Sequence, residues 1–135
     1  MRKSAEPSDK ALRQRAKRQL ETLEERAWRV LKYTLYNHTM TVDQYTALRV
    51  AQADRCGACR EPLRFGETRA VTVDHDPKCC QYKTLGTKRT KGMPISCGKC
   101  VRALLCSPCN RAVGFLERYP QRLHMWIEYV RRINK

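Results

Sequence analysis

The sequence predicts one small α+β domain that is mainly helical and is stabilised by metal-bound cysteines. Long charged stretches without Gly or Pro favour helices, whereas β-branched residues gather in only two short segments. All eight cysteines fall into close pairs, and 135 residues is about the length of one domain. With 41% hydrophobic residues and few aromatics, the core is small, so a bound metal would supply folding energy that burial alone cannot.

The N-terminal part predicts one long basic helix. Residues 1–9 are polar and are expected to be loose, and the helix is expected over about 9–36, with an apolar stripe at Ala16, Leu20, Leu23, Ala27 and Val30. Three roles remain open for this helix: packing on its own domain, lying solvated, or pairing with a second subunit.

The elements of the middle of the chain follow from local signals. Thr41 and Gln44 form a capping box that starts a second helix, which is expected to end near Asp54. Residues 67–73 carry β-branched positions and predict a strand that ends before the run 74–77, Asp-His-Asp-Pro. Residues 78–99 predict an irregular basic loop, and residues 101–105 a second short strand that leads into the last cysteine pair.

Two helices are expected after the second strand. Ser107 is the predicted N-cap of the first, with Pro108 at its first position, and this helix is expected to reach about Tyr119. Pro120 ends it and can open the last helix. The apolar face of that last helix comprises Leu123, Trp126, Ile127 and Val130.

The net charge points to a polyanionic partner. Lys and Arg number 28 against 13 Asp and Glu, which gives 28 − 13 = +15, and the excess is spread along the chain. Such a surplus most often serves nucleic-acid binding. The longest apolar stretches are far shorter than the roughly 20 residues of a membrane span, and no signal peptide is visible. We therefore expect a cytoplasmic protein with no membrane partner.

The cysteine spacing predicts zinc. Three pairs are Cys-x-x-Cys and one pair is adjacent, and in a reducing compartment such pairs are typical zinc ligands. Spacing alone does not decide which pairs share an ion, and buried or disulfide-bonded cysteines are the alternative. The pairs that bracket the basic loop leave a second zinc, free thiols and a labile disulfide all open, because adjacent cysteines are awkward ligands for one ion. These residues are Cys79, Cys80, Cys97 and Cys100.

Three polar residues suit metal-assisted phosphodiester hydrolysis. The Asp74 carboxylate and the Asn110 amide oxygen are hard ligands of the kind that Mg²⁺ prefers. A neutral imidazole at His75 can take a proton from an attacking water near physiological pH. His38 and His124 have no such neighbours in the sequence and are expected to be structural or solvent-facing.

Two motifs together resemble a known family. Residues 72–76, Thr-Val-Asp-His-Asp, followed by residues 101–114, Val-Arg-Ala-Leu-Leu-Cys-Ser-Pro-Cys-Asn-Arg-Ala-Val-Gly, resemble the phage recombination endonuclease VII family of HNH, or ββα-metal (His-Me finger), nucleases. Residues 41–48 and the pair Cys56/Cys59 resemble the same family's lead-in. The resemblance covers roughly residues 33–117. It departs from the family at Pro77, where the family commonly has a second histidine, and in its short C-terminal part.

The resemblance implies a zinc-bound ββα-metal nuclease domain over residues 41–135, with residues 1–40 as a basic helical extension for dimerisation or DNA contact. It implies that Asp74 and Asn110 hold a catalytic Mg²⁺ or Mn²⁺, that His75 is the general base and that Asp76 orients a neighbouring group. It also implies a homodimer that cuts branched DNA such as Holliday junctions, in a bacterial or phage-infected host cell. The structural zinc would be held by Cys56, Cys59, Cys106 and Cys109.

Two other functions remain open at this stage. One is an HNH enzyme that nicks ordinary duplex DNA, and the other is a non-catalytic zinc DNA-binding module, which would leave Asp74, His75 and Asn110 without a role. The preferred DNA structure and the pathway, whether packaging, recombination or repair, also remain open. A subset of the basic side chains is expected to contact phosphate, drawn from Lys78, Lys83, Lys88, Arg89, Lys91, Lys99, Arg102, Arg111, Arg118, Arg122, Arg131 and Arg132.

Overall fold

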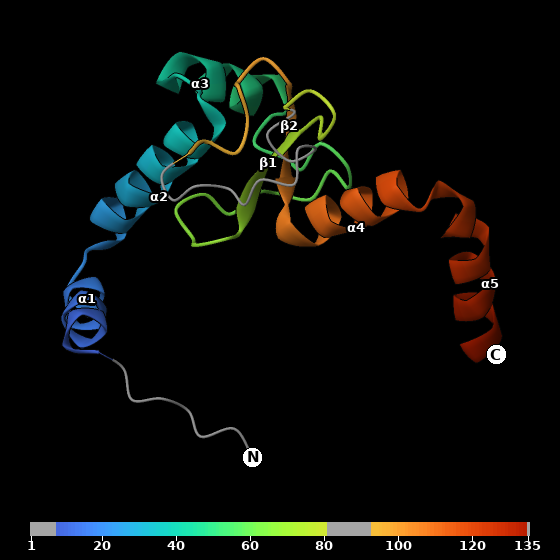
Figure 1. Ribbon diagram of the computed structural model, residues 1–135, viewed down its shortest axis with the longest axis horizontal. Coiled ribbons are helices and arrows are strands. Elements are labelled where there is room, and N and C mark those ends of the chain that lie inside the picture. Colours follow the sequence, from blue (N-terminus) through green and yellow to red (C-terminus); the bar gives the residue numbers. More distant parts are fainter. Residues whose placement is uncertain (1–7, 81–92, 135) are drawn as a thin grey trace.

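A two-stranded antiparallel sheet lies at the centre of the computed structural model, which describes residues 8–80 and 93–134. Strands β1 (Val71–His75) and β2 (Val101–Cys106) form this sheet, and helices α3 and α4 pack beside it, whereas α1 and α5 project away at opposite ends (Figure 1). The mixed α+β class is thus confirmed. The basic residues expected at positions 83, 88, 89 and 91 lie outside the described residues. The helices are α1 (Asp9–Gln19), α2 (Leu23–His38), α3 (Val42–Ala51), α4 (Ser107–Arg118), the short 3₁₀ helix η2 (Pro120–Arg122) and α5 (Leu123–Ile133).

The prediction of one long N-terminal helix is wrong, because the chain breaks between α1 and α2. Thr22 caps α2 with a complete capping box, in which its hydroxyl accepts from the Glu25 amide and the Glu25 carboxylate accepts from the Thr22 amide. These two bonds satisfy amides that a new helix start leaves unpaired. The predicted apolar stripe is not a continuous buried face, because Leu20 is 86% exposed and Leu23 is 81% exposed on either side of the break.

Helix α3 begins at the predicted capping box and is attached to β2 by one buried side chain. The Gln52 amide nitrogen donates to the Leu104 carbonyl and its oxygen accepts from the Leu104 amide, both at 2.8 Å. Gln52 therefore pairs with β2 as a neighbouring strand would. Because Leu104 is completely buried, these bonds satisfy backbone groups that water cannot reach.

Strand β1 begins later than predicted and includes the residues expected just after it. Residues 67–70 form turns, with Arg69 at a positive φ of 63°, so β1 runs from Val71 to His75. Asp74 pairs with Ala103 and His75 pairs with Val101, which leaves Arg102 as an extra residue on β2. Such a bulge bends the strand locally and re-aims side chains. It lies at the strand end that carries both Asp74 and His75.

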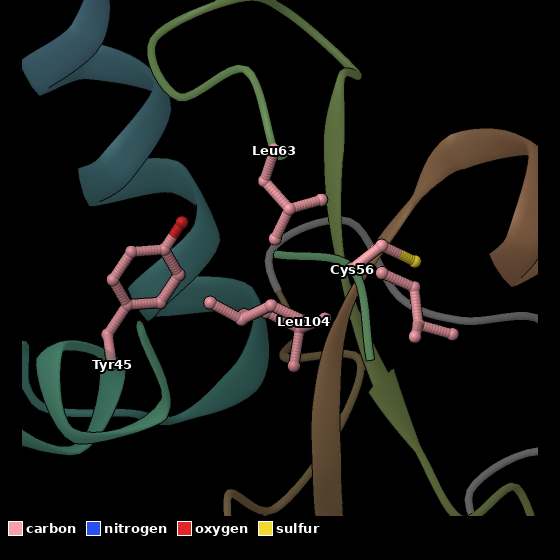
Figure 2. Close-up of a cluster of buried hydrophobic side chains, with 6 residues drawn as sticks. Tyr45, Cys56, Leu63 and Leu104 are labelled. Carbon is pink, nitrogen blue, oxygen red and sulfur yellow. The ribbon is translucent and has the colours of Figure 1, made fainter. Parts of the chain in front are cut away.

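The hydrophobic core is small, as its composition predicts. It joins α3, the turn after it and the two strands, and Figure 2 shows Tyr45 and Leu63 facing Leu104 and Cys56. A cysteine of the predicted zinc set is therefore itself a core residue. The buried members are Tyr45, Cys56, Leu63, Val73, Leu104 and Leu105.

The C-terminal helices follow the prediction except at one residue. Cys106 is the N-cap of α4 and has extended backbone because it still belongs to β2, so Ser107 is the first helical residue and not the cap. Pro120 opens η2, and α5 follows. The predicted apolar face of α5 is largely exposed, with Trp126 at 38% and Val130 at 49%. Within the described chain, no helix combines the length and apolarity that a membrane crossing requires.

Candidate metal and catalytic site

The first cysteine cluster joins the turn after α3 to the junction of β2 and α4. The sulfurs of Cys56, Cys59, Cys106 and Cys109 all lie within 4.8 Å of one another. The Cys59 and Cys106 sulfurs are 3.9 Å apart, close to the ~3.8 Å that a tetrahedral zinc with Zn–S bonds of about 2.3 Å requires. The set can hold a zinc ion, and it brings together the two Cys-x-x-Cys pairs that the family resemblance assigned to one ion.

Local hydrogen bonds prepare one thiolate in this cluster. Burial alone would raise the pKa of Cys56, but backbone hydrogen bonds from Cys59, Cys106 and Ala58 lower it to about 6. Hydrogen bonds with Cys106 and Cys59 instead raise the pKa of Cys109 to about 12. The hydrogen bonds within the cluster therefore shift the pKa values of these two thiols in opposite directions.

The second cluster contains the four cysteines that bracket the basic loop. Their sulfurs also lie within 4.8 Å of one another, and Cys80 and Cys100 are buried. Both members of the adjacent pair contribute a sulfur. The structure thus brings all four residues together, and this cluster too can hold a zinc ion.

Asp74 is held by an arginine from the neighbouring strand. Arg102 Nε and Nη2 donate to the two carboxylate oxygens of Asp74 at 2.8 and 2.9 Å, while Nη1 donates to Glu117 on α4. The hydrogen bonds with Asp74, and then with Glu117, raise the pKa of Arg102. Arg102 is therefore engaged by two carboxylates in this structure. Sequence reasoning missed both this pairing and Glu117.

Asn110 lies in the first turn of α4, which packs against both strands. Gly114 and Glu117 follow it by four and seven residues, so the three share one helix face. The Arg102–Glu117 contact ties the far end of that face to Asp74. A Cβ added at Gly114 would meet no atom within 4 Å, so open space lies along this face between Asn110 and Glu117.

Among the described residues, Asp74 belongs to no cluster of three or more close ligand side chains. In residues 8–80 and 93–134, groups of three or more His, Cys, Asp or Glu ligands occur only as the two cysteine clusters. Asp76, expected as an orienting group, accepts the Lys78 amide in a tight turn through its side chain, at 2.8 Å. Its described side-chain bond is therefore local and shapes the chain after β1.

His75 ends β1 and lies against a second histidine that the sequence did not connect to it. The rings of His38 and His75 are 5.6 Å apart between centroids and inclined by 56°. His38 is buried at the end of α2, and its Nδ1 is 3.1 Å from the Ser96 hydroxyl. Only the tertiary fold reveals this pair, because the two histidines lie on different elements. His124 is exposed on α5.

A comparison with known protein families identifies one family that matches most of the chain. The model of the family described as Recombination endonuclease VII matches residues 27–132, a span that runs from α2 into α5. It contains both cysteine clusters together with Asp74, His75 and Asn110, and it confirms the resemblance found in the motifs. No curated protein and no solved structure matches the chain.

Proposed function

Because the chain belongs to the recombination endonuclease VII family, we propose that this endonuclease cleaves branched DNA such as Holliday junctions by metal-dependent phosphodiester hydrolysis. One observation supports the proposal: Asp74 and His75 are consecutive residues at the bulged end of β1, and α4, which carries Asn110 in its first turn, packs against both strands. This is a ββ-hairpin followed by a helix, the arrangement from which a ββα-metal site is built. A purely DNA-binding module would need none of these three side chains.

The residues present suit a hard divalent cation. Asp74 and Asn110 would hold Mg²⁺ or Mn²⁺ through oxygen atoms, with water filling the remaining positions. Arg102 does not exhaust Asp74, because a carboxylate offers about four lone-pair positions and a bidentate arginine takes two. When bound, the cation would stabilise negative charge on the scissile phosphate and on the departing 3′ oxygen.

His75 would act as the general base. It would accept the proton of the attacking water as the new phosphorus–oxygen bond forms. The ring is half-buried, and His38 packs against it, so its orientation is restricted before DNA arrives. The first cysteine cluster would bind a structural zinc and pin the start of α4, and therefore Asn110, to the core around Cys56.

DNA binding would rest on shape and charge. A net charge of +15 suits contacts with phosphates, and a branch is defined by its geometry and not by base edges. A junction presents two equivalent strands, so we propose a symmetric homodimer with two active sites. The exposed apolar face of α5 supports an additional partner surface, and the basic extension over residues 1–40 would add contacts with DNA or with the second subunit.

The test compares a four-way junction with a linear duplex of the same arm sequence, each incubated with the protein and Mg²⁺. Paired nicks in opposite strands of the junction are expected, and little cutting of the duplex. Equal cutting of both would replace this proposal with a duplex-nicking enzyme, and binding without cutting would replace it with a DNA-binding module.

A pair of histidine variants tests the site within the same assay. His75→Ala should lower the cleavage rate by roughly 10²–10⁴-fold while junction affinity stays near that of the parent protein. His124→Ala is the matched control, because His124 is exposed on α5, and it should cut normally. Cleavage by His75→Ala at the parent rate would contradict the proposal that His75 is the general base.

A further inference from the structure

We propose that Cys79, Cys80, Cys97 and Cys100 bind a second zinc ion, and that this ion holds His75 in place through the end of α2. The binding site stands on the geometry of the cluster alone. The claim that this ion positions a catalytic base, His75, rests in addition on the proposed function. Neither the family match nor the motifs assign an ion to these residues.

The sulfur positions fit a tetrahedral ion. The distance is 3.8 Å from Cys79 to Cys97 and from Cys97 to Cys100, and 3.4 Å from Cys80 to Cys100. A zinc ion with Zn–S bonds of about 2.3 Å holds its sulfurs ~3.8 Å apart, whereas a disulfide needs about 2.05 Å. Hydrophobic packing does not explain why four thiols, two of them buried, converge at this spacing. Coordination of one shared cation does explain it.

The backbone explains how adjacent cysteines can share one ion. The turn at Asp76 brings the chain back on itself, with the Cys79 amide donating to the Asp76 carbonyl at 3.2 Å. The Cys97 amide donates to the Cys80 sulfur at 3.2 Å, a bond typical of thiolates in zinc knuckles. This turn and this hydrogen bond allow both adjacent cysteines, Cys79 and Cys80, to direct their sulfurs to one ion.

The knuckle formed by residues 97–100 is packed against the end of α2. Gly98 has a positive φ of 78°, and a Cβ there would collide with the Thr39 carbonyl oxygen, so only glycine fits. Just before the knuckle, Ser96 is completely buried, and its carbonyl accepts from the Thr39 hydroxyl at 2.8 Å. The Ser96 amide donates to the Asn37 carbonyl at 3.1 Å.

Two short routes connect this knuckle to His75. The first is through the backbone, since the Asp76 amide, next to His75, donates to the Cys100 carbonyl at 3.0 Å. The second is through side chains, since the Ser96 hydroxyl bonds to His38, whose ring packs against His75. A zinc ion that fixes the knuckle would thus restrain the strand end and the ring together. His38 acts in this scheme as a positioning residue.

Zinc counting by native mass spectrometry tests the binding site. The full-length protein purified under reducing conditions should carry two zinc ions per chain. Cys79→Ser and Cys59→Ser should each carry one, and they form a matched pair because both cysteines are exposed members of different clusters. A parent protein with one ion, lost in Cys59→Ser and kept in Cys79→Ser, would overturn the proposal.

Thiol labelling of the parent protein tests the same claim if a variant fails to fold. Cys79 and Cys97 should resist an alkylating reagent until zinc is removed by a chelator, and should then react. Labelling of both residues before chelation would show free thiols. A mass lower by two hydrogens, with labelling only after reduction, would show a disulfide, and either result would overturn the proposal.

Histidine side-chain NMR tests the positioning independently of DNA cleavage. The chain has three histidines, so each ring can be assigned. In Cys79→Ser, the ring signals of His38 and His75 should shift or broaden, while those of His124 stay unchanged. Unchanged His38 and His75 signals in a variant that has lost one zinc would overturn the positioning role. If the protein does not cleave junctions, the proposed function is wrong, but zinc counting, thiol labelling and the histidine signals still test the second zinc site.

Discussion

Arg102 Nε and Nη2 donate to the two carboxylate oxygens of Asp74 at 2.8 and 2.9 Å, and the same guanidinium reaches Glu117 on α4. The guanidinium therefore binds the same carboxylate as the proposed metal ion would, and it takes two of about four lone-pair positions on it. The arrangement neutralises Asp74 in the absence of metal, and it ties β1, β2 and α4 together through one side chain. Metal binding and the Arg102 contact are expected to compete for the same carboxylate.

Replacing Arg102 should strengthen metal binding. In Arg102→Ala, the Mg²⁺ concentration for half-maximal cleavage should fall about fivefold or more, because a pair between an exposed arginine and a half-buried carboxylate contributes about 1 kcal/mol or more, and tenfold in affinity corresponds to 1.4 kcal/mol. A Mg²⁺ titration of the cleavage rate measures this. Arg49→Ala is the control, since Arg49 grips Asp54 with the same geometry away from the site. A higher Mg²⁺ requirement in Arg102→Ala would instead assign Arg102 to the DNA phosphate.

Replacing Gly114 should raise folding stability and lower the cleavage rate. In Gly114→Ala, stability should rise by about 0.5–1 kcal/mol, because alanine favours a helix and the new methyl group meets no atom within 4 Å. Urea unfolding measures this gain. If the DNA backbone runs along this face next to Asn110, the new methyl group enters the space that it needs, and cleavage should fall. Ala112→Gly, on an exposed position of the same helix, should lose similar stability and keep its activity. Unchanged cleavage in Gly114→Ala would move the DNA away from this face.

Gln52 should be a major determinant of folding stability. Gln52→Leu removes both bonds to Leu104. The Leu104 carbonyl keeps the Gly57 amide at 3.0 Å, but the buried Leu104 amide loses its Gln52 acceptor, so a loss of roughly 1–3 kcal/mol is expected. Denaturant unfolding of the zinc-loaded protein measures this loss. Gln121→Leu, on exposed η2, is the control and should change stability little. Equal stability of the two variants would show that α3 is held to the sheet by apolar contacts alone.

Binding to DNA should depend steeply on salt. If the basic surface neutralises six or more phosphates, the affinity for a junction should fall roughly a thousandfold between 50 and 200 mM salt. Fluorescence anisotropy with a labelled junction measures the affinity, and a plot of log affinity against log salt gives the number of contacts. A nearly flat plot would contradict a phosphate-based interface and would assign the net charge of +15 to another partner.

Local signals in the sequence mark most element boundaries, including the break in the N-terminal helical region. The capping box at Thr41 and the proline at the start of η2 mark real helix boundaries. The same kind of capping box at Thr22 and Glu25 was equally readable, and it explains why the N-terminal helix breaks in two. The predicted strand starts too early because Thr68 is β-branched and yet lies in the turns that precede Val71.

The sequence by itself determined the helices from Thr41 onward, the cysteine pairs, the family and the adjacency of Asp74 and His75, because each of these depends on residues close together along the chain. Only the tertiary structure decided which cysteines converge, that Arg102 grips Asp74 and that His38 packs against His75. These contacts join separate elements. They depend on how the strands pair and where the helices pack, and the spacing of residues along the chain does not specify either.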